Sequence, residues 1–477
     1  MDHYGLFING EESEGATGER MPVIYPYTGE AFATVSVAAP ADVERAIASA
    51  HATYRQHLRT MPAHERGRLL MRTAEVINAH RQEFTDAIAR EVGKPLKDVA
   101  IEAGRGGELF VMCAGETRDI VGELLPMDAI RGGEGRWGFV LRQPLGVIAA
   151  IGPFNAPLNL VAQKVAPALA AGNTVVVKPA SKTPIAAVLL ARCIHEAGWP
   201  AGTCNVVIGP GGTVGDPLVA DPRVRMVSFT GGTEVGARIR ERAGLKRVAL
   251  ELGSNAPNIV CADADLTKAA AAITRSGFSS AGQQCISAQR VYVQREVEER
   301  FTRIFLDAVG ALKVGDPLDP DCDVGPMISE DEAKRVEEWL NEATAAGARL
   351  LIGGKREGAL LWPTIVSNPR PDLRVHCQEV FAPVVTLTTF DTVDEAIELA
   401  NDTRYGLQAA AFTNDLNTAL RFARELDSGC VWINEGSRYR QDNYPFGGVK
   451  DSGLGREGVK YAIQEMSETK FVGIKTG

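Results

Sequence analysis

The chain has 477 residues, of which 45% are hydrophobic and 23% are charged, the composition of an ordinary globular protein. That length predicts two or three domains, because a single hydrophobic core rarely extends so far. The formal net charge of −9 argues against nucleic acid as a partner, since phosphate binding needs a basic surface. The first residues lack the pattern of a signal peptide and no apolar stretch is long enough for a bilayer, so we expect a cytoplasmic protein that binds no membrane.

The cysteines and histidines do not form a metal-binding pattern. The eight cysteines are scattered without a C-x-x-C pair, which indicates reduced thiols in a chain without a secretion signal. The seven histidines include no H-E-x-x-H and no close group with cysteine. We therefore expect no metal site.

The first half of the chain changes its pattern along its length. Residues 1–40 contain short strand-like pieces broken by glycine and proline, and residues 41–118 have the apolar spacing and the composition of amphipathic helices. The segment 120–142 holds glycines between two strand-like pieces, which predicts a hairpin. From residue 146, helical stretches such as 184–197 alternate with apolar β-rich runs. The runs cover 147–151, 174–177, 205–208, 226–229 and 248–252. This alternation predicts a doubly wound parallel sheet that binds a nucleotide beyond the carboxyl ends of its strands.

A second α/β series follows between residues 265 and 434. Helices are expected at 266–276, 297–309 and 330–346, and strands at 290–293, 384–388 and 429–433. A last strand is expected at about 469–474. Because no low-complexity linker separates the two series, we expect closely packed domains.

Several segments are candidates for binding nucleotide phosphates. The formal G-x-G-x-x-G match at Gly453, Gly455 and Gly458 follows no strand, so we interpret it as a turn. The string F-T-G-G-T-E-V-G (229–236) follows a strand and enters a helix, where paired glycines let the backbone approach a pyrophosphate. A plain turn remains the alternative there. Lys178 ends a strand, where its side chain can reach ribose or phosphate oxygens or lie on the surface.

A cysteine and a carboxylate are candidates for covalent chemistry. Cys285 sits in G-Q-Q-C-I-S-A-Q-R (282–290) and Glu251 in L-E-L-G-S-N-A-P (250–257), each in a glycine-bearing turn. A thiolate is a nucleophile, and a carboxylate can act as a base. Asn155 lies between the two prolines of P-F-N-A-P. Its side-chain amide could donate a hydrogen bond to an oxyanion, or the residue could simply stabilise a turn.

Eight strings taken in chain order resemble those of the aldehyde dehydrogenase superfamily, the NAD(P)-dependent enzymes that oxidise aldehydes to acids. They are P-F-N-A-P, K-P-A-S, F-T-G-G-T-E-V-G, E-L-G-S-N-A-P, G-Q-Q-C, E-V-F-A-P-V, W-I-N and P-F-G-G-V-K-D-S-G-L-G-R-E. The resemblance covers nearly the whole chain. The string R-x-D-N-x-P-F-G-G (440–448) is similar to the lactaldehyde, non-phosphorylating glyceraldehyde-3-phosphate and phosphonoacetaldehyde dehydrogenase branch.

The resemblance implies a role for each matching residue. Cys285 would be the nucleophile and Glu251 the general base, and Asn155 with the backbone N–H of Cys285 would form the oxyanion hole. Glu468 matches a carboxylate suggested to relay protons. Ser181 replaces a glutamate that holds ribose hydroxyls in many NAD-preferring members, so either NAD or NADP is expected. The residues implied to contact this cofactor are Ile151, Phe154, Lys178, Ser181, Gly211, Phe229, Gly231, Gly232, Leu252, Glu379 and Phe381.

The resemblance also implies a three-part α/β fold and an oligomer. A Rossmann-type NAD(P)-binding domain would cover residues 1–119 and 143–252, and an α/β catalytic domain would cover 253–440. A small β oligomerisation arm would be built from 120–142 and 455–477, which implies a homodimer or a homotetramer.

The expected reaction is the NAD(P)⁺-dependent oxidation of a small aldehyde, with hydroxylated aldehydes favoured, through a thioester on the cysteine. Gln284 stands where phosphate- and phosphonate-using members carry an arginine, which argues against an anionic phosphorus substrate. Arg105, Arg438 and Arg440 are candidates for anchoring an acid group. An acid-semialdehyde dehydrogenase of the succinate-semialdehyde type, a CoA-acylating enzyme and a catalytically silent structural homologue remain alternatives.

Overall fold

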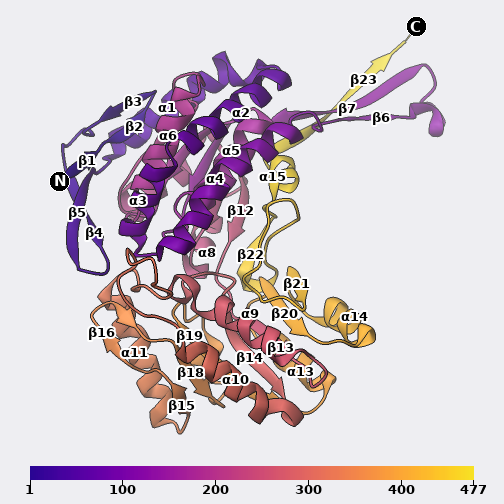
Figure 1. Ribbon diagram of the computed structural model, residues 1–477. Coiled ribbons are helices and arrows are strands. Elements are labelled where there is room, and N and C mark those ends of the chain that lie inside the picture. Colours follow the sequence, from indigo (N-terminus) through magenta and orange to yellow (C-terminus); the bar gives the residue numbers. More distant parts are fainter. Residues whose placement is uncertain (477) are drawn as a thin grey trace.

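The computed structural model describes residues 1–476, and Gly477, the last residue of the expected arm, lies outside the described residues. Figure 1 shows two large lobes, one above the other, and a thin arm that projects from the upper lobe. The three-part α/β architecture implied by the resemblance is confirmed. Within residues 1–476, every helix is too short or too polar to cross a membrane.

The upper lobe is built on an eight-stranded sheet in the order β22-β12-β11-β8-β9-β10-β2-β3. The five strands from β12 to β10 run parallel and are mostly buried on both faces, which explains their continuous apolar runs. The chain winds outward from β8 in both directions, and such a switch point is where open sheets bind ligands. The strand bounds are β2 (Leu6–Ile8), β3 (Glu11–Ser13), β8 (Val147–Ile151), β9 (Thr174–Lys178), β10 (Cys204–Val206), β11 (Val224–Thr230), β12 (Arg247–Glu251) and β22 (Gly453–Leu454). The five predicted runs are therefore confirmed, with ends that differ by at most two residues.

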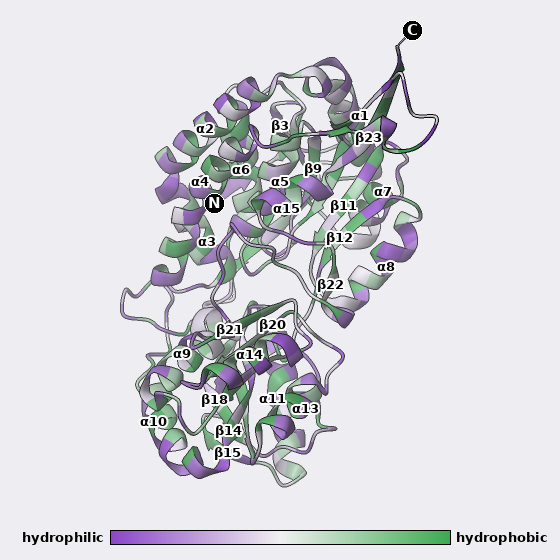
Figure 2. Ribbon diagram, turned by 90° about the vertical axis from the view of Figure 1, so that its right-hand side faces the viewer, coloured by the Kyte–Doolittle hydropathy of each residue, from purple (hydrophilic) through white to green (hydrophobic). Residues whose placement is uncertain are grey.

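Helices cover both faces of this sheet. They are α1 (Pro40–Gln56), α2 (Ala63–Ala79), α3 (Arg81–Val92), α4 (Leu96–Glu116), α5 (Asn159–Ala171), α6 (Ile185–Glu196), α7 (Asp216–Ala220), α8 (Thr233–Ala243) and α15 (Val459–Glu465). The first four confirm the helical interpretation of residues 41–118. In α2, the buried side chains of Leu70, Ala74 and Ile77 recur at helical spacing on the face that packs against α4. Figure 2 shows the hydrophilic residues of α8 on its outer turns.

The lower lobe is built on a seven-stranded sheet in the order β15-β18-β19-β14-β13-β20-β21, parallel except at β15. Its strands are β13 (Ala256–Val260), β14 (Ala288–Gln294), β15 (Arg349–Ile352), β18 (Thr364–Ser367), β19 (Val384–Phe390), β20 (Gln408–Phe412) and β21 (Cys430–Ile433). Its helices are α9 (Leu266–Phe278), α10 (Glu298–Gly310), α11 (Glu330–Ala345), α12 (Arg374–Cys377), α13 (Val393–Asn401) and α14 (Leu416–Glu425). The hairpin of β16 (Arg356–Glu357) and β17 (Leu360–Leu361) lies beside α11. The helices and strands predicted here are confirmed.

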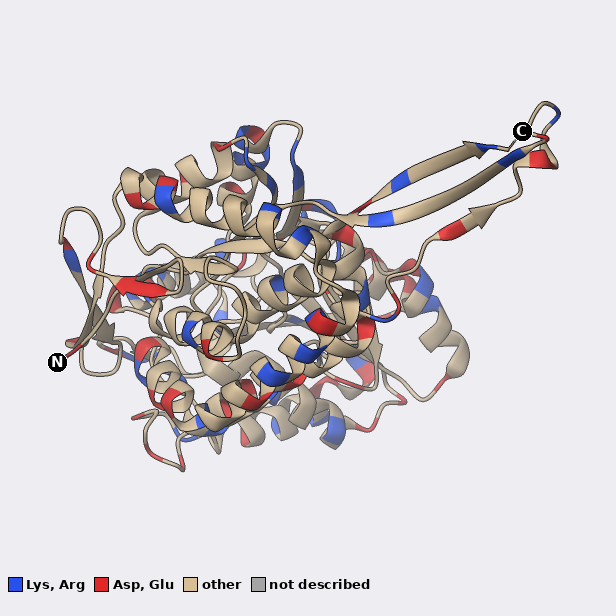
Figure 3. Cartoon of the chain, turned by 90° about the horizontal axis from the view of Figure 1, so that it is seen from above, with Lys and Arg blue, Asp and Glu red and all other residues tan. Residues whose placement is uncertain are grey.

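The arm is a three-stranded antiparallel sheet of β6 (Glu123–Leu125), β7 (Arg136–Pro144) and β23 (Ser467–Lys475). The predicted hairpin and last strand are confirmed. Helix α15 packs against α4 and α5, so the arm sheet starts at Ser467 and not at residue 455. Figure 3 shows the arm from above, projecting from the body with scattered charges. A separate sheet near the N-terminus combines β1 (Asp2–Tyr4), β4 (Arg20–Tyr25) and β5 (Glu30–Ser36).

The segment that matches G-x-G-x-x-G runs from the edge strand β22 to the start of helix α15. Gly453 lies in the edge strand β22, and Gly458 precedes α15 with a φ of +95°. A Cβ at Gly458 would lie 2.1 Å from the carbonyl oxygen of Tyr444. Glycine is needed here because two backbone segments touch, and the segment does not line the main cavity.

We predict that Gly458→Ala destabilises the protein, because the new Cβ meets the backbone and the left-handed conformation disfavours alanine. The free energy of unfolding should fall by about 2 kcal/mol or more, which denaturant titration would measure. Gly115→Ala is the matched control, since nothing lies within 4 Å of a Cβ at that helical position. Equal stability of the two variants would contradict this account of the turn.

Candidate active site

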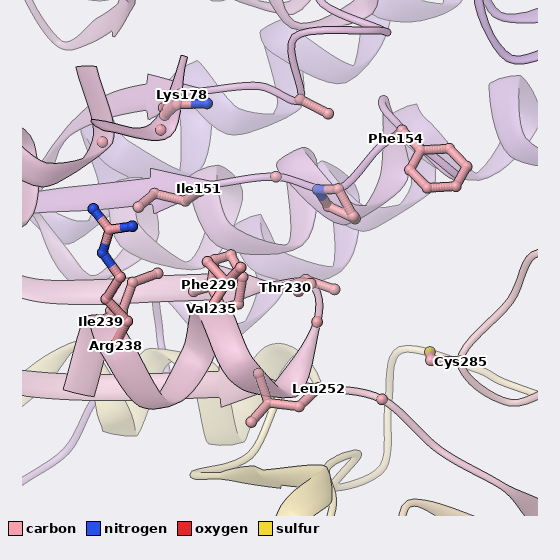
Figure 4. Close-up of a pocket in the computed structure, with 18 of the residues that line it drawn as sticks. Ile151, Phe154, Lys178, Phe229, Thr230, Val235, Arg238, Ile239, Leu252 and Cys285 are labelled. Carbon is pink, nitrogen blue, oxygen red and sulfur yellow. The ribbon is translucent and has the colours of Figure 1, made fainter. Parts of the chain in front are cut away.

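A cavity of about 480 Å³ lies at the carboxyl ends of β8, β9, β11 and β12, and residues of the lower lobe close one end of it. Figure 4 shows Cys285 at that end, away from Lys178 and Arg238. Most of the predicted site residues line this cavity: Ile151, Phe154, Asn155, Lys178, Gly211, Phe229, Gly231, Gly232, Leu252, Cys285, Glu379 and Phe381. Glu251 and Ser181 do not.

Cys285 follows a loop whose backbone is fixed by close contacts. Gly282 has a φ of +66°, and a Cβ there would lie 2.0 Å from the carbonyl oxygen of Ala382. The side chain of Gln283 accepts a hydrogen bond of 2.8 Å from the backbone N–H of Ile328. The glycine of the G-Q-Q-C string is therefore required by a backbone contact, and the loop holds the cysteine at the cavity wall.

The Cys285 thiol is held in its protonated form. Burial raises its pKa to about 12, and the carboxylates of Glu379, Glu251 and Glu457 add to the increase, whereas the charge of Arg440 opposes it. The thiolate is the reactive species, so this cysteine needs a nearby proton acceptor to act as a nucleophile.

Asn155 lies next to the cysteine loop, between β8 and α5. Its side-chain Nδ2 donates a hydrogen bond of 2.8 Å to the backbone carbonyl of Gln283. An amide group carries two N–H donors, so one remains for a ligand. Within residues 1–476, the backbone N–H of Cys285 has no intramolecular acceptor. Nearby, the rings of Phe154 and Phe381 meet edge to face with centroids 5.7 Å apart.

Glu251 is the last residue of β12 and is buried behind the cavity wall. Its Oε2 has no hydrogen-bond partner among the described residues. Burial raises its pKa well above the usual range, and the negative charge of Glu457 raises it further. The ionised, proton-accepting form therefore becomes more populated as the pH rises through that raised pKa. A buried carboxylate with an open oxygen is suited to accept a proton from water or from a thiol.

A buried charge network lies beside Glu251, and the sequence analysis missed it. Lys164 on the fully buried helix α5 donates to Thr230 Oγ1 at 2.6 Å and to Glu457 Oε1 at 2.7 Å. Arg440 donates to Glu457 Oε2 at 2.7 Å. Burial alone would raise the pKa of Glu457, but the two cations outweigh it and hold the pKa below its usual value.

The carboxylate that raises the pKa of Glu251 is thus Glu457, whereas Glu468, which matches a carboxylate suggested to relay protons, lies elsewhere. Glu468 lies in β23 of the arm, opposite Gln143. The sequence contained a signal for the network, because Lys164 is the only charged residue of α5, whose other residues are apolar except for Asn159 and Gln163.

The cavity has the features that a dinucleotide needs. No atom lies within 4 Å of a Cβ built on Gly211 or Gly232, so these backbones are open to a ligand, and Gly232 precedes the N-terminus of α8. Burial lowers the pKa of Lys178 to about 8, and among the described residues its ammonium donates a hydrogen bond only to the carbonyl of Pro179, at 3.3 Å. Burial raises the pKa of Glu379 to about 7. A buried cation without a carboxylate partner is suited to a phosphate, and a carboxyl group such as that of Glu379 can accept hydrogen bonds from hydroxyl groups.

Ser181 lies apart from these residues. Its hydroxyl donates to the carbonyl of Gly209 at 3.0 Å, and the residue borders a separate hollow of about 310 Å³ beside β4. Cavity residues that the sequence analysis missed include Asp216, Val219, Val235, Arg238 and Ile239. Within residues 1–476, no group of three or more His, Cys, Asp or Glu side chains is placed to hold a metal ion.

Comparison with known proteins gives one consistent family. A model of the aldehyde dehydrogenase family matches residues 13–472. The 3-sulfolactaldehyde dehydrogenase of Priestia aryabhattai is 45% identical, over 99% of this chain and 98% of that protein. The structure of an NAD-dependent aldehyde dehydrogenase from Sinorhizobium meliloti has a TM-score of 0.97 at 36% identity and covers 100% of this chain and 95% of that chain. The NADP-dependent glyceraldehyde-3-phosphate dehydrogenase of Bacillus halodurans C-125, complexed with NADP, has a TM-score of 0.97 at 37% identity and covers 100% of both chains. This chain therefore belongs to the aldehyde dehydrogenase family and is an NAD(P)-dependent enzyme.

Proposed function

We propose that this enzyme oxidises a small, hydroxylated aldehyde to its carboxylic acid through a thioester on Cys285, which water hydrolyses with Glu251 as the base. The supporting observation is a protonated thiol in the cavity wall with a buried carboxylate that has one oxygen free. The balanced reaction consumes aldehyde, water and NAD⁺ or NADP⁺, and it yields acid, reduced cofactor and a proton.

In the first half-reaction, the Cys285 sulfur attacks the aldehyde carbon and the thiol proton is released to solvent water, which makes it the proton of the balanced reaction. A C–S bond forms, and the carbonyl oxygen becomes an oxyanion that the free N–H of Asn155 and the backbone N–H of Cys285 stabilise, by about 3 kcal/mol per donor. The oxidised nicotinamide ring, when bound, supplies the acceptor for the hydride that leaves this carbon. Loss of the hydride leaves a thioester on Cys285.

In the second half-reaction, Glu251 takes a proton from water as the water oxygen attacks the thioester carbon. The C–S bond breaks, the acid leaves, and the proton passes from Glu251 to the Cys285 sulfur, so that both groups return to their starting forms. The charge of Glu457, fixed between Lys164 and Arg440, keeps Glu251 the more basic of the two carboxylates. Because a hydrolytic base is present, transfer of the acyl group to CoA is the less supported alternative.

The substrate class follows from the relatives and from one arginine. Sulfolactaldehyde and glyceraldehyde 3-phosphate, which the names of two relatives give, are three-carbon hydroxyaldehydes with an acid group. Arg438 donates to the side chain of Gln284 at 2.9 Å, next to the nucleophile, and also contacts Asp98 at 3.2 Å. Arg440 forms a salt bridge with Glu457, and Arg105 forms one with Asp442, so both already have a carboxylate partner. A second candidate is therefore an aldehyde with a sulfonate or carboxylate, including an acid semialdehyde of the succinate type, with Arg438 facing the acid group.

We also propose that the enzyme is a cytoplasmic homodimer or homotetramer assembled through the arm. Trp137, Leu141 and Ile474 on one face of the arm sheet are 57%, 42% and 48% exposed. Trp137 stands opposite Ile474 in the strand register, so these side chains share a face. An exposed apolar face on a thin projecting sheet is expected to be covered by a second copy of the chain.

We predict that Glu251→Gln separates the two half-reactions. The variant should release about one equivalent of reduced cofactor per chain and then stop, because formation of the thioester does not require Glu251, whereas its hydrolysis does. Steady turnover should fall by about 10² to 10⁴, and intact mass spectrometry should find the acyl adduct.

The measurement is cofactor absorbance without CoA, with NAD⁺ and NADP⁺, on lactaldehyde, glyceraldehyde, glycolaldehyde, succinate semialdehyde, phosphonoacetaldehyde and benzaldehyde. Cys285→Ala is the control and should show neither burst nor turnover. Turnover by that control, or unchanged steady turnover by Glu251→Gln, would refute the roles proposed here.

We predict that Arg438→Gln discriminates between substrates that differ only in an acid group. Its KM for sulfolactaldehyde should rise about tenfold, the worth of one charge-assisted hydrogen bond, while its KM for lactaldehyde stays the same. Arg275→Gln is the control, because Arg275 is exposed and contacts Glu435 in the neighbouring segment. If both substrates change equally, Arg438 has a structural role and the acid-bearing candidate loses its support.

We predict that the double substitution Leu141→Glu and Ile474→Glu dissociates the assembly. Size-exclusion chromatography with light scattering should give the mass of a single chain, because carboxylates on the apolar face of the arm would be buried without partners. Lys475→Glu, which changes a charge on the other face of the arm, is the control and should keep the wild-type mass. A wild-type mass for the double variant would rule this face out.

A further inference from the structure

The end of the cavity farthest from Cys285 combines an apolar slot with charged groups. Val219 on α7 and Val235 and Ile239 on α8 line the slot, which is suited to a flat aromatic base. Asp216 on α7 and Arg238 on α8 also line this part of the cavity. Figure 4 shows Arg238 beside Ile239, on the side away from Cys285.

The carboxylate of Asp216 is shared by two arginines. The guanidinium of Arg238 is hydrogen-bonded to it, and Arg242, one turn further along α8, lies 3.5 Å from the same oxygen. Arg238 lines the cavity and its side chain is 58% exposed, whereas Arg242 does not line it. Because Arg242 stays with Asp216, Arg238 can turn towards a ligand without leaving that carboxylate unpaired.

A second cationic side chain, that of Lys178, lies next to the residue before Asp216. The methylene carbons of Lys178 lie 3.5 Å and 3.6 Å from the position of a Cβ on Gly215, the residue before Asp216. Lys178 is buried, and within residues 1–476 its one polar partner is the carbonyl of Pro179. The side chain of Lys178 therefore packs against Gly215, and the next residue, Asp216, binds the guanidinium of Arg238, so one short segment of backbone contacts both cationic side chains, an arrangement that favours a doubly charged phosphate.

We propose that Arg238 determines cofactor choice by binding the 2′-phosphate of NADP⁺, and that Asp216 opposes this choice by retaining Arg238 when the ribose carries a 2′-hydroxyl. With NADP⁺, the guanidinium exchanges the Asp216 carboxylate for the phosphate, and Lys178 adds a second positive charge. With NAD⁺, the ion pair stays closed. This inference deepens the proposed function and rests on it for the identity of the dinucleotide.

The test measures binding in the absence of aldehyde. Calorimetry would give the Kd of NAD⁺, NADP⁺ and 2′,5′-ADP for the wild type, Arg238→Gln, Asp216→Asn and the control Arg240→Gln, whose arginine is on the same helix but outside the cavity lining. Arg238→Gln should raise the Kd of NADP⁺ and of 2′,5′-ADP about tenfold and leave the Kd of NAD⁺ unchanged. The control Arg240→Gln should bind all three ligands as the wild type does. Asp216→Asn should lower the Kd of NADP⁺, because it removes the competing carboxylate.

Three results would overturn the proposal: equal weakening of both cofactors by Arg238→Gln, no weakening of NADP⁺ binding by it, or a wild type that does not bind NADP⁺. Failure of the proposed aldehyde oxidation is distinguishable, because it would abolish turnover and leave this pattern of binding constants in place. A wild type that binds neither dinucleotide would refute both.

Discussion

The arrangement of the site depends on one buried ion cluster, in which Glu457 is held between Lys164 and Arg440. Two cations outweigh the cost of burying Glu457, so this carboxylate stays charged and raises the proton affinity of Glu251 beside it. The cluster also has a mechanical role. Lys164 lies on α5 under the first sheet, whereas Glu457 and Arg440 come from the segment that returns from the lower lobe. The same contacts that tie α5 to the returning segment therefore set which of two carboxylates can take a proton.

The cavity between the lobes divides into ends with different chemistry. At one end, the constrained loop of Gly282 presents Cys285, and Asn155 is tied to that loop through Gln283. At the other end, helices α7 and α8 provide apolar walls and an ion pair in which the arginine is exposed to the cavity. The reacting end is held by several backbone contacts. At the cofactor end, in our proposal, Arg238 can exchange the carboxylate of Asp216 for a phosphate. Such a division suits an enzyme that needs one fixed chemistry with more than one electron acceptor.

Much of the fold and most of the cavity lining could be predicted from the sequence, because both depend on local signals. The strand at 147–151 is buried on both faces and reads as a continuous apolar run, and the residues after it carry recognisable strings. Strand β20, Q-A-A-A-F, was not predicted, since alanine favours a helix and only the neighbouring strands make it β. Glu457 and the Asp216–Arg238 pair were missed for a related reason: the roles of these residues come from contacts between distant segments, which no local pattern records.

The strand β22 has a consequence for how the chain is made. It pairs with β12 and completes the edge of the first sheet, yet it consists of Gly453 and Leu454, which follow the whole lower lobe in the sequence. On the ribosome, the edge of β12 therefore stays open until nearly the entire polypeptide has emerged. An unpaired edge of this kind invites association with other nascent chains, so the interval before β22 docks is when this protein depends most on chaperones.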